Sequence, residues 1–179
     1  MANSKTARER IELFGEEAVR LPKAIKNEDP TVEPKRKILF VASEARPFIA
    51  TGGLADVIGS LPQALAKDPT YDIRVVLPLY SDIKQDMRRK MSFLGNIYIP
   101  LSWRNQYCGI FRCKQEGVTY YFLDNKYYFG RPYIYGLGGD EYERYGFFCR
   151  AALNALPLLD FQPDIIHCHD WQTGMVPAL

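Results

Sequence analysis

The stretch that decides the fold begins with Lys37-Ile38-Leu39-Phe40-Val41-Ala42 and runs through a loop to Thr51-Gly52-Gly53. The first run is apolar with polar residues on both sides, which is typical of a strand buried on both faces of a parallel sheet. After the glycines, apolar residues recur at helical spacing and mark the core face of a helix; they are Leu54, Val57, Ile58, Leu61 and Leu65. The stretch predicts a strand, a loop and a helix, the repeating unit of an α/β fold.

The same pattern returns further along the chain. Residues 72–78 repeat the buried strand and end at a proline. Three β-like runs follow, the last two joined by a hairpin turn; they cover residues 93–101, 107–114 and 118–123. Next come a helix bearing Tyr145, Phe148, Ala152, Leu153 and Leu156, and a buried strand at 165–168. We expect a Rossmann-like, mostly parallel sheet of three or four parallel strands with one antiparallel β insertion.

The two ends of the chain differ from this central part. Residues 1–35 are rich in Lys, Arg and Glu and close with a proline-containing segment, so we expect an N-terminal extension and linker with room for one short helix. The remaining residues, 36–179, form one expected domain. Because the chain stops a few residues into the helix expected from Trp171, we expect this domain to be incomplete at its C-terminus.

The amino-acid composition limits the kinds of ligand that the protein is expected to bind. The chain has 23 basic and 21 acidic residues, and the net charge of +2 provides no single-sign field for nucleic acid or an anionic membrane. The four cysteines form no C-x-x-C pair and are expected to be reduced. No window approaches the ~20 apolar residues of a membrane span. We therefore expect a cytoplasmic protein that binds a small ligand.

Gly52 and Gly53 lie where a strand leads into a helix, a position at which backbone amides and the helix dipole favour an anion such as a diphosphate. Taken alone, the pair is better explained as a tight turn. Asp56, one helical turn later, has a comparable structural explanation as an acid that favours the helix dipole.

A second group of polar residues follows the strand at 165–168. His169 and Asp170 stand where ligands bind in open α/β sheets, although Asp170 is also a favoured residue for capping the next helix. His167 and His169 share a face and, with further ligands, would bind zinc, so a metal-dependent hydrolase is an alternative. Trp171 and Tyr135 suit either a sugar-stacking surface or the core.

A longer string adds a resemblance to a known family. Residues 43–57 resemble the signature that opens glycogen and starch synthases, Lys-x-Gly-Gly-Leu-x-Asp-Val after the first strand. The similarity continues through residues 75–80, 124–129, Arg144 and 163–171, and covers about residues 36–179. It implies the truncated N-terminal lobe of the two-lobed GT-B fold, whose active site lies between two Rossmann-like domains.

The resemblance also implies an activity. It implies retaining transfer of glucose from ADP-glucose to the non-reducing 4-hydroxyl of an α-1,4-glucan, with a missing C-terminal lobe as partner and no cofactor beyond the donor. A lobe alone is expected to be inactive. A non-catalytic glucan-binding module is therefore a further alternative.

By the same resemblance, Asp170 has a catalytic role. The residues implied to contact substrate are Gly52, Gly53, Asp56, Tyr135, His169 and Trp171. One position departs from the family pattern, because Ala50 stands where the signature has Lys. A cation that would contact the donor diphosphate is absent there.

Overall fold

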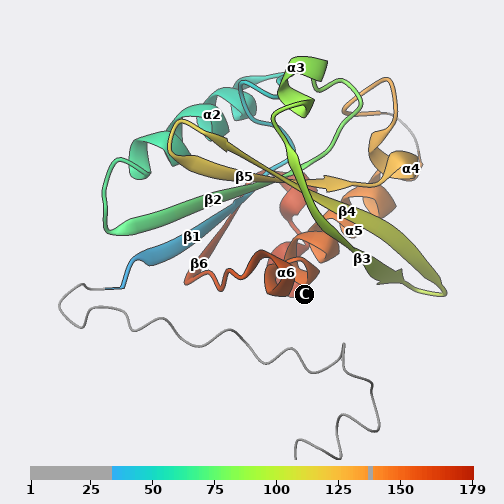
Figure 1. The fold of residues 1–179 in the computed structure, drawn as a ribbon. Helices are drawn as coiled ribbons and strands as arrows, with labels where there is room; N and C mark the ends of the chain where they lie inside the picture. Colours follow the sequence, from blue (N-terminus) through green and yellow to red (C-terminus); the bar gives the residue numbers. More distant parts are fainter. Residues whose placement is uncertain (1–33, 137–138) are drawn as a thin grey trace, which may run out of the picture. The chain divides into compact units, whose positions relative to one another are not determined.

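The computed structural model describes residues 34–136 and 139–179, and Figure 1 shows their arrangement. The expected N-terminal extension, with its short helix, lies almost entirely outside the described residues. The strands are β1 (Arg36–Val41), β2 (Tyr71–Pro78), β3 (Ser92–Leu101), β4 (Arg104–Gln115), β5 (Val118–Asp124) and β6 (Ile165–Cys168). The helices are α2 (Gly53–Leu65), α3 (Gln85–Arg88), α4 (Lys126–Phe129), α5 (Glu141–Asn154) and α6 (Leu156–Leu159), and two 3₁₀ turns follow, η2 (Trp171–Thr173) and η3 (Val176–Ala178).

The strands form one mixed sheet in the order β3-β4-β5-β2-β1-β6. Strands β5, β2, β1 and β6 pair in parallel, and β4 pairs antiparallel with both β3 and β5, so β4 is the one strand of the described sheet that runs in the opposite direction. The predicted α/β class and the antiparallel insertion are confirmed. The chain reverses direction twice, between β3 and β4 and between β4 and β5, and these reversals return β5 to a parallel pairing with β2.

Helices cover both faces of the sheet, with α2 and α3 on one face and α5 and α6 on the other (Figure 1). On the α2 face, Phe48 from the loop after β1 packs against Tyr120 and Phe122, each with ring centroids 4.9 Å apart. On the α5 face, Phe147 packs at the same centroid distance against Tyr128. Aromatic contacts therefore hold the loop after β1 against β5 on one face, and α5 against α4 on the other.

Three local predictions need correction. In helix α2 the expected core face is largely confirmed, because Ile58 is buried and Leu54, Leu61 and Leu65 pack partly buried against the core. Val57 was wrongly included: it is 46% exposed, and Ala55 and Pro62 are buried as well. Strand β6 lies at the edge of the described sheet, so Ile165 is 43% exposed instead of buried. The segment from Trp171 forms the two short 3₁₀ turns instead of starting one α-helix.

Other expectations agree with the described residues. Strand β2 ends at Pro78, and β4 and β5 are joined by a tight turn. All four cysteines are free, three of them buried. Within the described ranges, no helix combines the length and apolar character needed to cross a bilayer.

The centre of the α5 side is organised by Arg144, whose side chain is completely buried. Its guanidinium donates to the carbonyl oxygen of Ile134 at 2.7 Å and pairs with Glu141 at 3.1 Å. It also lies over the ring of Tyr80, 5.5 Å from the centroid. A buried charge is tolerated only when it is paired and hydrogen-bonded, so these contacts fix α5 against two loops.

We predict that Arg144→Ala lowers the free energy of unfolding by about 3–5 kcal/mol, because the substitution leaves the Glu141 carboxylate buried without its partner. Urea denaturation followed by circular dichroism measures the change. Arg150→Ala is the matched control, since Arg150 lies on the same helix with a solvent-exposed hydrogen bond to Pro100 and should change stability by less than about 0.5 kcal/mol. Equal losses in the two variants would contradict the prediction.

Candidate functional site

The site forms where β1 and β6 end side by side. Val41 and Cys168 are paired in the parallel register, and the backbone N–H of His169 donates to the Val41 carbonyl oxygen at 3.1 Å. The loop that begins at Ser43 and the segment that begins at His169 therefore leave the same edge of the sheet. This is the edge at which ligands bind in open α/β folds.

A buried carboxylate shapes the loop after β1. Glu44 is only 3% exposed, and its Oε2 accepts hydrogen bonds from the backbone N–H of Thr51 at 2.5 Å and from Thr51 Oγ1 at 2.9 Å. These bonds fix the residue that directly precedes Gly52. Glu44 was not among the predicted site residues, although an acid close to the end of an apolar strand is an available signal, because a buried acid needs a partner.

Nothing in the described structure requires glycine at positions 52 and 53. Gly52 precedes α2 in an extended conformation, Gly53 is its first residue, and neither has a positive φ. A Cβ atom at either position would meet no atom within 4 Å. Gly59 differs, because a Cβ there would lie 2.9 Å from the Cβ of Arg46. The tight-turn explanation of the pair therefore has no support, and the exposed backbone at the start of α2 is open to a ligand.

The two predicted aromatic residues are connected through Tyr145. Tyr135 is half-buried, its hydroxyl lies 2.8 Å from Ser43 Oγ, and burial raises its pKa. Its ring centroid is 6.3 Å from that of Tyr145. Trp171 lies edge-on to Tyr145 at 5.2 Å and is 51% exposed. Tyr135 therefore packs partly into the core, whereas Trp171 leaves much of its ring open.

His169 is held against the sheet with one nitrogen unused. Its ring stacks on Phe40 at a centroid distance of 5.6 Å and an interplanar angle of 16°. Burial, and to a lesser degree the neighbouring His167, lower the pKa of His169 to about 4. The imidazole is therefore neutral at pH 7. Its Nε2 atom is buried and has no hydrogen-bond partner among the described residues.

Asp170 has the geometry expected of a cap. Its Oδ1 accepts from the backbone N–H of Trp171 at 2.7 Å, at the head of η2. Its backbone has φ 63° and ψ 178°, a conformation that costs a residue other than glycine about 1–3 kcal/mol and that is concentrated at functional sites. The capping interpretation is therefore confirmed, and the catalytic role stays a prediction.

The remaining predicted position, Asp56, forms an ion pair with Arg46, and both side chains are 62% exposed. Ala50, at the position of the family lysine, is also exposed. The rings of His167 and His169 lie 4.2 Å apart. Within residues 34–136 and 139–179, however, no three His, Cys, Asp or Glu side chains form a group able to hold a metal ion.

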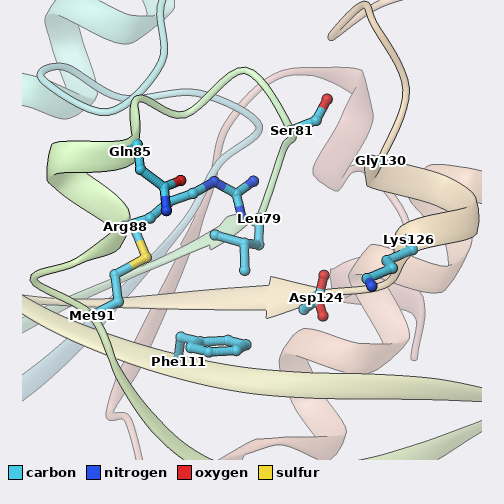
Figure 2. Close-up of a pocket in the computed structure, with 9 residues that line it drawn as sticks. All are labelled: Leu79, Ser81, Gln85, Arg88, Met91, Phe111, Asp124, Lys126 and Gly130. Atoms are coloured by element: carbon cyan, nitrogen blue, oxygen red, sulfur yellow. The ribbon is translucent and has the colours of Figure 1, made fainter.

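A hollow of about 460 Å³ opens at the same edge, over β2 and β5 (Figure 2). Arg88 lies on its α3 side and donates to the backbone oxygens of Tyr80 and Ile83, whereas Asp124 and Lys126 lie on the opposite side. Burial raises the pKa of Asp124. The other lining residues are Leu79, Ser81, Gln85, Met91, Phe111 and Gly130. None of the predicted site residues lines this hollow.

Comparison with known proteins identifies the family. The profile of the starch synthase catalytic domain matches residues 37–179. The chain belongs to the starch synthase catalytic domain family. It is 55% identical to the glycogen synthase of Anoxybacillus flavithermus and 53% identical to that of Clostridium kluyveri, over 80% of this chain and 29% and 30% of those proteins. The family predicted from the sequence is confirmed.

A solved structure supports the fold of this catalytic domain. The catalytic domain of Starch Synthase IV from Arabidopsis thaliana, bound to ADP and acarbose, is 30% identical with a TM-score of 0.71. The match covers 80% of this chain and 29% of that structure. The six-stranded sheet thus matches part of the catalytic domain of a starch synthase, as expected of one lobe of the GT-B fold. The chain spans about three tenths of the length of the relatives it matches.

We predict that Glu44→Ala lowers the free energy of unfolding by about 1.5–3 kcal/mol, because Thr51 loses a charged hydrogen-bond acceptor in a buried setting. Glu44→Gln keeps an acceptor oxygen and should lose less than half as much. Thermal and urea denaturation measure both variants. Equal losses would mean that the volume of the side chain matters and its hydrogen bonds do not.

We predict a fall in stability as the pH drops from 6.5 to 4. His169 has a pKa of about 4 when folded and 6.5 when unfolded, so the unfolded chain binds more protons in this interval. Because the side chain is about half exposed to screening, the expected contribution is about 1–2 kcal/mol. His169→Gln should remove this contribution. His167→Gln should retain most of it, because burial is the main cause of the shift. Parallel stability curves for the wild type and His169→Gln would contradict the prediction.

Proposed function

We propose that the chain is the acceptor-side, N-terminal lobe of a glycogen synthase. Together with a second lobe, it would transfer glucose from ADP-glucose to the non-reducing 4-hydroxyl of an α-1,4-glucan with retention of configuration. The observation that carries the proposal is the Gly52–Gly53 pair. Its backbone is exposed at the start of α2, and neither local conformation nor packing requires glycine there.

In this proposal, the first turn of α2 faces the diphosphate of the donor. The first N–H groups of a helix lack intrahelical partners and carry the positive end of the dipole, so they suit an anion. Without side chains at Gly52 and Gly53, a phosphate oxygen approaches these groups directly. The bonds from Glu44 to Thr51 hold the backbone in place before the ligand arrives. With Ala50 in place of a lysine, this lobe relies on backbone contacts at that point.

The segment after β6 supplies the groups that meet sugar. His169 contributes the accessible part of its neutral, half-buried ring to the sugar site, while its Nε2 atom is buried. The exposed Asp170 carboxylate orients the acceptor hydroxyl or stabilises the positive charge that develops on the transferred glucose. The open ring of Trp171 provides a face on which a glucose unit stacks.

The proposal divides the reaction between two lobes. The relatives are more than three times as long as the matched region, and we assign the second lobe to their remaining length. Transfer requires closure around the donor and exclusion of water, so this lobe binds ligand and does not transfer glucose by itself. We propose that it needs no cofactor besides the donor. We place the protein in the cytoplasm, where cysteines stay free as they are here.

Backbone chemical shifts of the chain, titrated separately with ADP-glucose and with maltohexaose, test the proposal. We expect ADP-glucose to shift the amides of Gly52 and Gly53, and maltohexaose to shift Trp171. Gly53→Ala should keep the stability of the wild type, since its Cβ meets only open space, and should weaken ADP-glucose binding about tenfold. Gly59→Ala is the reverse control, because its Cβ crowds Arg46 and should cost stability.

Each contrary result removes a different part of the proposal. Unchanged ADP-glucose affinity in Gly53→Ala would remove the diphosphate contact. Binding of maltohexaose alone would favour the glucan-binding module. Glucose incorporation into glycogen by the isolated chain, above a heat-inactivated control, would overturn the division between lobes.

A further inference from the structure

A second concave site lies at the opposite edge of the sheet, near the starts of β1 and β2. Figure 1 shows this edge, at which both strands begin. Its volume is about 410 Å³, within the range of small-ligand sites. Its lining includes four basic side chains, those of Lys35, Arg74, Arg112 and Lys114, and one acidic side chain, Asp72. The candidate transfer site lies at the carboxyl edge of the same strands, so the two sites are separated by the length of the sheet.

The strand register gathers these cations on one face. Thr119 of β5 pairs with Arg74 of β2 on one side and with Lys114 of β4 on the other. Arg112 is two residues from Lys114 and opposite Tyr121, in the next row. Because residues two apart on a strand share a face, Arg74, Lys114 and Arg112 lie on the same side of the sheet.

One of the cations is already neutralised and fixed. Arg74 pairs with Asp72 at 3.1 Å, donates to the Tyr121 hydroxyl at 2.7 Å and lies over the ring of Phe161, 4.0 Å from its centroid. The Asp72 carboxylate is therefore paired with Arg74. Among the described residues, no other acidic side chain lines the pocket, so the charges of the other three cations are not neutralised there.

Lys35, Arg112 and Lys114 have no ion pair with any carboxylate in the described part of the chain. Arg112 and Lys114 are two residues apart on one face of β4, where their like charges repel each other. A bound anion relieves this repulsion. The guanidinium of Arg112 suits phosphate oxygens, which it contacts with a planar pair of donors, and each lysine adds a compact charge.

We propose that this pocket binds a phosphorylated small molecule, with the phosphate held by Lys35, Arg112 and Lys114. The site goes beyond the proposed glucosyl transfer, since it lies away from the residues assigned to that reaction. The phosphate is the shared chemistry of two sources, free inorganic phosphate and a hexose phosphate. The half-buried hydroxyl of Thr119, between Arg74 and Lys114, gives a sugar hydroxyl a hydrogen-bonding partner.

Calorimetric titration of the full 179-residue chain tests the site with inorganic phosphate, pyrophosphate, glucose 1-phosphate and uncharged glucose as probes. We expect saturable binding of the phosphate-bearing probes that weakens with added salt. The double variant Arg112→Gln/Lys114→Gln should weaken this binding about tenfold or more. Lys84→Gln, which removes an exposed cation beside α3, should leave it within about twofold. Chemical shifts should change at Gly117 and Thr119.

Tighter binding of glucose 1-phosphate than of inorganic phosphate would support a hexose phosphate as the occupant, and equal binding would support recognition of phosphate alone. The proposal is overturned by absence of saturable phosphate binding in the millimolar range, by equal losses in Lys84→Gln and the double variant, or by glucose binding as well as glucose 1-phosphate does. Shifts at Gly52 and Gly53 instead of Gly117 would assign the phosphate to the transfer site. The proposed function is tested separately, by the chemical shifts of Gly52 and Gly53 in the titration with ADP-glucose.

Discussion

The buried guanidinium of Arg144 supports the candidate site from the interior of the protein. It has no contact with water, so its charge depends on the carbonyl oxygen of Ile134, the carboxylate of Glu141 and three aromatic faces. Two of those rings, Tyr80 and Tyr145, are joined through their hydroxyls at 3.0 Å. Tyr145 in turn meets Trp171. The charge of Arg144 thus contacts α5 and two loops directly and reaches the segment after β6 through Tyr145, so these connections are held in one arrangement.

The parallel sheet separates two kinds of chemistry. At the carboxyl ends, the polar groups belong to loops and are exposed backbone, a neutral imidazole and carboxylates. At the amino ends, cations project from the strands themselves, in a register that the pairing with β5 enforces. Because the two edges present different chemical groups, a ligand that binds at one edge is not expected to compete with a ligand at the other. A single layer of strands therefore supports two independent recognition surfaces.

Much of this arrangement follows from local sequence. Strands β1 and β2 were predicted from their apolar runs and from the proline that ends β2. The family was predicted from the ordered motifs between Ser43 and Trp171. The exposure of Val57 in α2 did not follow, because Ala55 and Pro62 compete with it for the buried face and only packing against the sheet decides between them. The exposure of β6 depends on strand order, which periodicity does not contain. The buried role of Glu44 depends on Thr51, seven residues away, and the strained backbone of Asp170 has no sequence signal.

Because the space around Gly52 and Gly53 is open, the effect of a substitution on folding can differ from its effect on ligand binding. Because no neighbouring atom would contact an added methyl group, folding places almost no restriction on these positions. A survey that scores variants by expression level or melting temperature would rate both glycines as freely replaceable. A survey that scores binding of a ligand at the start of α2 would rate them by what that ligand permits. If substitutions at Gly52 and Gly53 preserve stability and weaken binding, the ligand is recognised by the backbone at these positions. A comparison of side chains alone would miss such a site.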